Sequence, residues 1–70
     1  MQRESLAILK FLATHAKPKT AIAIALGSGV PKRITSEAID KLVNLGFVEF
    51  RYPAAYQVTA VGINKIKSLP

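Results

Sequence analysis

The sequence has no cysteine and no tryptophan, a single histidine, and four acidic residues against ten lysines and arginines. Without cysteine, neither a disulfide framework nor a thiolate metal site can form. His15 and four scattered carboxylates do not make a ligand set, so we expect no metal and no cofactor. Because the chain also lacks a Ser/His/Asp or Cys/His set and paired carboxylates, we predict that it is not an enzyme.

Long hydrophobic runs are absent as well. No stretch without a charge or proline is longer than residues 20–30, which are too few and too rich in glycine to cross a bilayer. The N-terminus carries Arg3 and Glu4 in place of the continuous apolar segment of a secretory signal. We therefore expect a cytoplasmic protein that does not associate with membranes.

The excess of positive charge is the strongest feature of the composition. Seventy residues with a net charge of +6 are enough for one small domain, which we predict to span residues 1–70. A pI near 10.1 on so small a surface favours a polyanionic partner, in preference to a charge that serves only solubility. The partner that we expect is nucleic acid.

Two helices are predicted before the middle of the chain. The first covers about residues 3–16, where Pro18 ends it, and buries a stripe of apolar residues widened by Ile8, Phe11 and Leu12. The stripe consists of Leu6, Leu9, Ala13 and Ala16. The second is a charge-free helix over residues 21–26, capped by Thr20 and stopped by Gly27. Its core face is predicted to carry Ile22, Ala23 and Leu26, which leaves Ala21 and Ile24 outward.

A third and longer helix is predicted over residues 32–45, after a turn over residues 28–31. Pro31 suits its first position, where a missing amide costs nothing. Its predicted buried rows contain Ile34, Ala38 and Leu42, and beside them Thr35, Ile39 and either Leu42 or Val43. The opposite face is polar and consists of Arg33, Ser36, Glu37, Asp40, Lys41 and Asn44.

After Gly46 the apolar period changes from helical to two, which predicts a β-hairpin. Its strands are residues 47–52 and 56–58, with Tyr52 expected to face Tyr56 across the ladder. Thr59 can then cap a last helix, over about residues 60–68, that buries Val61, Ile63 and Ile66. The predicted fold class is therefore mainly α with a small β-hairpin (α+β), in the order helix, helix, helix, strand, strand, helix.

This order resembles the winged helix-turn-helix domains of small MarR-, ArsR- and PadR-type regulators over nearly the whole chain. Three patterns carry the resemblance. They are Thr20 through Ala23 to Leu26-Gly27 in the second helix, Ala38-Ile39-Asp40-Lys41-Leu42-Val43-Asn44-Leu45-Gly46-Phe47-Val48 from the third helix into the wing, and Tyr56-Gln57-Val58-Thr59-Ala60-Val61-Gly62 at the start of the last helix. The resemblance implies sequence-specific binding of double-stranded DNA by a transcriptional regulator. It also implies that the third helix enters the major groove and that the hairpin is the wing.

Candidate DNA-binding residues follow from that geometry. Lys32, Arg33, Ser36 and Glu37 lie in the first half of the third helix, nearest the base edges. Phosphate contacts are expected from Lys17, Lys19, Thr20 and Lys41, and a contact to the flanking backbone or minor groove from Arg51. Such a small domain usually needs two copies for affinity. We therefore expect a homodimer through the apolar second helix or the terminal helices.

Three departures from the family pattern keep an alternative open. The turn before the third helix is about two residues longer than usual, the wing tip at residues 53–55 is uncharged, and the second helix is apolar where the family has polar residues. These features would also suit a winged helix that docks a protein through its second helix. The chain could also be a domain excised from a larger protein.

Overall fold

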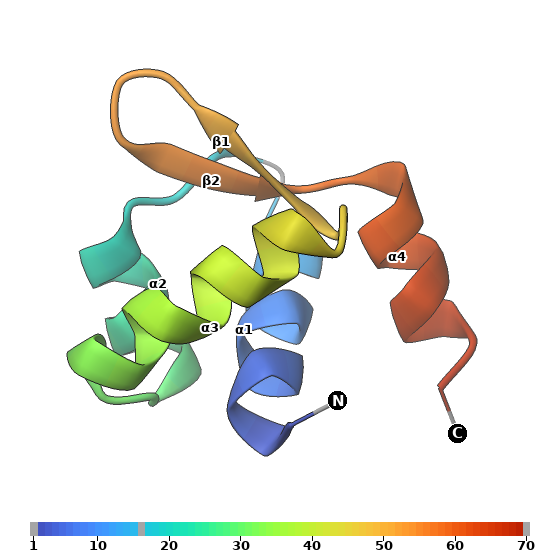
Figure 1. Ribbon diagram of the computed structural model, residues 1–70, viewed down its shortest axis with the longest axis horizontal. Helices are drawn as coiled ribbons and strands as arrows, with labels where there is room; N and C mark the ends of the chain where they lie inside the picture. Colours follow the sequence, from blue (N-terminus) through green and yellow to red (C-terminus); the bar gives the residue numbers. More distant parts are fainter. Residues whose placement is uncertain (1, 16, 70) are drawn as a thin grey trace.

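A computed structural model describes residues 2–15 and 17–69, which form four helices and one hairpin. In order these are α1 (Arg3–Ala13), α2 (Ala21–Ser28), α3 (Lys32–Asn44), β1 (Val48–Arg51), β2 (Ala55–Val58) and α4 (Ala60–Lys67). The hairpin lies above the helices in Figure 1, with α2 and α4 on opposite sides of it. The order and class confirm the predicted winged helix-turn-helix, mainly helical with a two-stranded antiparallel sheet.

The core lies where α1, α2 and α3 meet the start of β1. Its buried members are Ile8, Leu9, Leu12, Ile24, Val30, Ala38, Ile39, Leu42 and Val48. The predicted buried rows of α3 are confirmed for Thr35, Ala38, Ile39 and Leu42. Of the two residues expected to complete the second row, Leu42 is buried and Val43 is exposed. The Thr35 hydroxyl donates to the carbonyl oxygens of Val30 and Pro31, so this buried polar group is satisfied.

The first helix differs from its prediction at its end and in its buried face. It ends at Ala13, and Thr14 closes it through a hydroxyl that donates to the carbonyl of Phe11. Position 16 of the predicted helix lies outside the described residues. Burial of Ile8, Leu9 and Leu12 confirms that part of the predicted face. Ser5 is buried as well, which was not predicted, whereas Leu6 and Ala13 of the predicted stripe are only half-buried.

Two predictions for the second helix are wrong. Thr20 caps it as predicted, accepting from the Ala23 amide at 3.2 Å, but Gly27 does not end it. The helix continues to Ser28 and ends at Gly29, whose φ of 75° is the left-handed conformation of a C-terminal cap. Gly27 has another role inside the helix, because the Phe11 ring occupies the space that a Cβ at this position would need. The second correction concerns which side of this helix is buried.

The buried side of α2 is the one predicted to face outward. Ile24 is fully buried, whereas Ile22 is 56% exposed and Leu26 is 81% exposed. Ile24 and Gly27 are three residues apart and therefore share a helix face, so the close approach of Gly27 to Phe11 carries Ile24 into the core. A helix without charged residues offers no polar face from which this orientation could be predicted.

Two further predictions are wrong, one for the turn into α3 and one for the hairpin. Pro31 precedes the helix as its N-cap and is not its first residue. The strand register pairs Phe50 with Tyr56 and Arg51 with Ala55, so Tyr56 does not face Tyr52. Tyr52 lies in the turn and is 91% exposed. Because Pro53 has no amide hydrogen for the ladder, the strand ends before it.

A third segment extends the sheet. Lys19 pairs with Tyr56 in an antiparallel bridge, with N–O distances of 2.9 and 2.8 Å between the two backbones. The chain before α2 is thereby attached to the hairpin. Directly paired residues project from the same face of a sheet, so Lys19, Tyr56 and Phe50 share one face.

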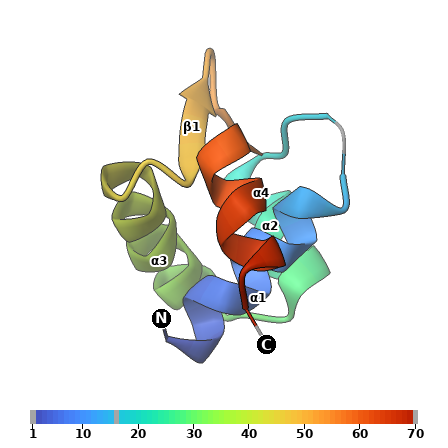
Figure 2. The same ribbon diagram turned by 90° about the vertical axis from the view of Figure 1, so that its right-hand side faces the viewer.

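The last helix packs against α1 and against the backbone that leads into the hairpin (Figure 2). Thr59 caps it as predicted, accepting from the Gly62 amide at 3.0 Å and donating to the Gly46 carbonyl at 2.6 Å. Gly62 is buried against the Phe47 carbonyl. Ile66 packs on the core as expected, but Val61 and Ile63 are exposed because Gly62 occupies the side nearest the hairpin. In the described part of the chain, no helix is long and apolar enough to cross a membrane.

Candidate nucleic-acid interface

The exposed face of α3 brings together all four residues predicted to read DNA bases. Thr35, Ala38, Ile39 and Leu42 anchor one side of the helix in the core, which directs the opposite side to solvent. That exposed side carries Lys32, Arg33, Ser36, Glu37 and Lys41, together with Asp40 and Asn44. Lys32 and Ser36 are one turn apart on one row, and Arg33, Glu37 and Lys41 follow one another on the neighbouring row.

The charge on this face is nearly balanced. Three cations stand beside the two carboxylates of Glu37 and Asp40, and none of these side chains forms a salt bridge within the described residues. The one salt bridge found there joins Arg51 to Glu49 within β1, at 3.4 Å. It lies at the surface, where such pairs contribute about 0–1 kcal/mol, so the Arg51 guanidinium can exchange partners.

The segment before α2 carries the other predicted phosphate contacts. Lys17 and Thr20 are exposed and Lys19 is half-buried beside the hairpin. The Thr20 hydroxyl caps α2, so it is already a hydrogen-bond acceptor from the Ala23 amide. The bridge between Lys19 and Tyr56 holds this segment next to the sheet, which places Lys19 beside the hairpin.

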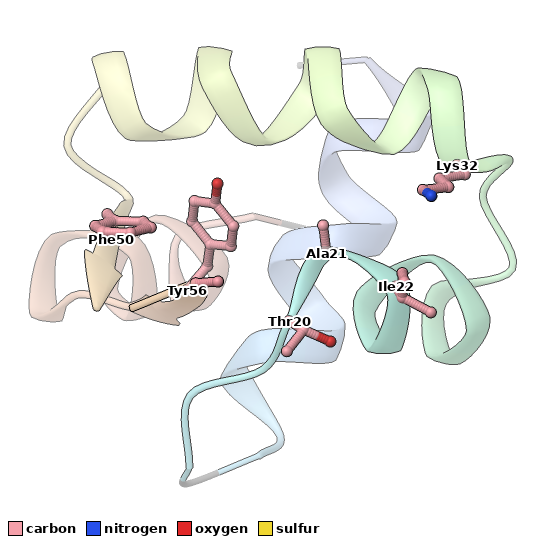
Figure 3. Close-up of a pocket in the computed structure, with 7 residues that line it drawn as sticks. Thr20, Ala21, Ile22, Lys32, Phe50 and Tyr56 are labelled. Atoms are coloured by element: carbon pink, nitrogen blue, oxygen red, sulfur yellow. The ribbon is translucent and has the colours of Figure 1, made fainter. Parts of the chain in front are cut away.

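A cavity of about 440 Å³ lies where these elements meet (Figure 3). It is lined by Thr20, Ala21 and Ile22 at the start of α2, by Lys32 at the start of α3, and by Phe50, Ala54 and Tyr56 of the hairpin. Two predicted DNA-binding residues, Thr20 and Lys32, thus share one hollow with the wing. The aromatic rings of Phe50 and Tyr56 meet edge to face, with centroids 5.5 Å apart.

Sequence reasoning missed the contribution of the hairpin to this hollow. Phe50 and Tyr56 were expected to be strand residues, with Tyr56 paired to Tyr52. The alternation of side chains along the strand indicated that Val48, Phe50 and Tyr52 share one face of the sheet. The cross-strand partner of Phe50 was therefore expected on that face. Only the register, which depends on the length of the turn, identifies that partner as Tyr56.

His15 packs at the end of α1, with its ring 4.2 Å from that of Phe11 and its Nδ1 2.6 Å from the Phe11 carbonyl oxygen. Among the described residues, no three His, Cys, Asp or Glu side chains are grouped so that they could hold a metal ion. These contacts show that His15 packs against α1 at the end of that helix.

Comparison with known proteins identifies the family. The model of the IclR helix-turn-helix domain matches residues 5–51, from α1 through β1. The match therefore covers all three core helices and the first strand of the wing. No curated protein matches the chain. The finding confirms a winged helix-turn-helix regulator, while it does not support the MarR, ArsR or PadR types specifically.

Proposed function

The chain belongs to the IclR helix-turn-helix domain family and is a DNA-binding transcription regulator, and we propose that it reads its site by inserting α3 into the major groove, with the hairpin as wing. The observation that carries this proposal is the arrangement of α3. One side is fixed in the core by four buried residues, and the other presents an uninterrupted row of polar side chains. A rigid helix with such a face matches the width of the major groove.

Base reading is assigned to the first half of α3. Arg33 is exposed and has the planar fork that binds guanine through two hydrogen bonds. Ser36 lies one turn further along and can bond to either kind of base edge. Glu37 can accept from a cytosine amine, and it repels phosphate when the helix sits in a wrong register. Lys32 lies at the edge of this face and borders the cavity.

Phosphate binding is assigned to residues around the reading helix. Lys17, Lys19 and Thr20 lie before α2, Lys41 lies on the second half of α3, and Arg51 lies on the wing. Because α3 itself, Lys41 included, has three cations against two carboxylates, Lys17, Lys19 and Arg51 outside it supply most of the attraction to the DNA backbone. Binding is then expected to weaken steeply as the salt concentration rises.

The test compares two variants on a site selected from a random DNA pool. Arg33→Ala is expected to cost about 1–3 kcal/mol on the selected site and to relax its specificity. Lys19→Ala is expected to weaken binding to all sequences alike and to reduce the salt slope by about 1. Fluorescence anisotropy at several salt concentrations measures both effects, with Lys67→Ala on α4 as a matched control. Equal losses on selected and random DNA for Arg33→Ala would overturn the assignment of that residue.

The same proposal treats residues 1–70 as one domain that acts as a homodimer. Ile22 and Leu26 lie one turn apart on a helix without charged residues, and both are exposed. Apolar side chains grouped in this way mark contact surfaces. A second copy seated on α2 would bury them and place two reading helices on one DNA molecule. Sedimentation velocity tests this, because Leu26→Ser is expected to shift the chain towards monomer, whereas Lys67→Ser leaves association unchanged.

A protein-docking module is the second candidate, and the exposure of Ile22 and Leu26 is the observation that favours it. A mobility shift on random duplex DNA separates the two candidates. Regulator function requires a shift at low salt that fades at moderate salt. A complete absence of binding at low salt would favour the docking module.

A further inference from the structure

The turn of the hairpin presents an aromatic side chain to solvent. Tyr52 follows β1 and is 91% exposed. The strand register pairs Tyr56 with Phe50, so Tyr52 takes no part in that ring pair. Pro53 and Ala54 come next and are exposed as well. Residues 52–54, called here the aromatic turn, therefore form an exposed and largely apolar projection.

The hairpin that carries the aromatic turn has no net charge. Within residues 48–58 the only charged side chains are Glu49 and Arg51, which pair with each other at 3.4 Å. The aromatic turn has no cation of its own, so it cannot gain affinity by releasing counterions from phosphates. Apolar side chains of DNA-binding proteins instead enter the minor groove and wedge against base steps. The chemistry of this turn therefore suits the groove better than the backbone.

The aromatic turn lies at the end of the molecule where the reading helix begins. Ala54 borders the same hollow as Lys32, the first residue of α3. In Figure 1 the turn of the hairpin and the first turn of α3 lie at the same end of the long axis, and in Figure 2 the hairpin projects beyond the helices. Neighbouring major and minor grooves are half a helical turn apart, roughly 17 Å. Because the domain measures 28 × 23 × 20 Å, α3 and the aromatic turn can occupy neighbouring grooves.

We propose that the aromatic turn is a second DNA-reading element, in which the Tyr52 ring enters the minor groove beside the site of α3 and wedges against a base step. This inference rests on the proposed function, since it requires α3 in the adjacent major groove. Burial of the ring drives the contact. The hydroxyl can donate to N3 of adenine or O2 of thymine, and Pro53 fixes one backbone angle of the turn.

Such a wedge gives specificity at a base step that no side chain of α3 contacts. Partial insertion unstacks the step, and pyrimidine–purine steps unstack most easily. A selected site is therefore expected to contain a TA or CA step in its flank. Replacing that step with a stiff run of adenines should weaken wild-type binding about fivefold. The same replacement should change binding of Tyr52→Ala by less than about twofold, because the variant has no ring to insert.

Fluorescence anisotropy on the selected site, at several salt concentrations, tests the ring directly. Tyr52→Ala is expected to weaken binding about tenfold and to leave the salt slope unchanged, because the ring is uncharged. Tyr52→Phe keeps the ring and should stay within about threefold of wild type. Arg51→Ala is expected instead to reduce the salt slope by about 1. Val61→Ala, which shortens an exposed apolar side chain on α4, is the matched control and should bind like wild type.

Insertion is measured separately with 2-aminopurine placed in turn at each position of the flank. This base analogue fluoresces more strongly when it is unstacked. Wild type and Tyr52→Phe should therefore raise the fluorescence at one position per bound copy, whereas Tyr52→Ala should not. A rise that persists in Tyr52→Ala would overturn the wedge, because another group would then be opening the step.

The outcomes separate this inference from the proposed function. If wild type and Tyr52→Ala bind the selected site equally, the wedge is refuted and the regulator function stands. If wild type binds no duplex at low salt, the proposed function fails and the wedge fails with it. Because Tyr52 is exposed, its replacement should leave the urea midpoint unchanged, so weaker DNA binding by the variant does not arise from unfolding.

Discussion

Gly62 provides a sharp test of how α4 is attached to the wing. Its amide donates to the Thr59 hydroxyl, and its missing side chain lets the helix lie against the Phe47 carbonyl. In Gly62→Ala the new Cβ would fall well inside van der Waals contact with that oxygen and 2.8 Å from Cγ2 of Val58. The oxygen cannot simply move away, because it accepts from the Thr59 amide at 3.0 Å.

The expected cost follows from two opposing terms. Alanine stabilises a helix interior by about 1 kcal/mol relative to glycine, whereas overpacking costs typically about 1–3 kcal/mol and sometimes more. The contact here is with backbone, which relaxes least, so we expect a net loss of about 1–2 kcal/mol. A domain of this length has a total stability of roughly 4–10 kcal/mol, so the loss is measurable.

Urea unfolding followed by circular dichroism is the assay, with the midpoint compared at constant slope. Gly29 supplies the control, because it has a φ of 75° and open space around its Cβ position. Gly29→Asn should therefore recover much of the loss seen in Gly29→Ala, since asparagine tolerates this conformation. Gly62→Asn should recover nothing. A Gly62→Ala protein as stable as wild type would refute the close packing of α4 on Phe47.

Two further predictions use the same unfolding assay. Ile24→Ala should lower the free energy of unfolding by about 2–5 kcal/mol, because Ile24 is fully buried. Ile22→Ala should change it by at most about 0.5 kcal/mol, because Ile22 is exposed. Similar losses in both variants would contradict the orientation of α2. Thr59→Val should lower the free energy of unfolding by about 1–2 kcal/mol, since it removes the hydrogen bonds of the Thr59 hydroxyl with the Gly62 amide and the Gly46 carbonyl. Thr14→Val, at an exposed helix end, should lower it by less.

The sequence was sufficient for the order of elements because several boundaries have a local chemical cause. Thr20 and Thr59 have hydroxyls that accept from helix amides, and both caps were predicted. Helix α3 alternates apolar and polar residues with helical period, so its buried face could be read directly. The exposed positions of Arg33 and Ser36 follow from that periodicity.

The orientation of α2 could not be read in this way. Its residues are all apolar or small, so every face has nearly the same preference for the core. The orientation of α2 is decided by the contact between Gly27 and the Phe11 ring, and this contact depends on how α1 and α2 cross. Gly27 and Gly29 also look alike in sequence, although one permits close packing and the other a left-handed backbone. Tertiary contacts assign these two roles.

The cavity likewise depends on a relation between distant segments. Lys19, Tyr56 and Phe50 come from three stretches of chain, and backbone pairing holds them in one row across the sheet. Because side chains alternate along a strand, a slip of one residue would turn the Tyr56 ring to the opposite face. The last pair of the register joins Arg51 to Ala55. It lies next to a turn that contains Pro53, a residue that cannot donate a hydrogen bond to the ladder. A short turn at the tip of the hairpin thus determines which hydroxyl is directed towards α3 (Figure 3).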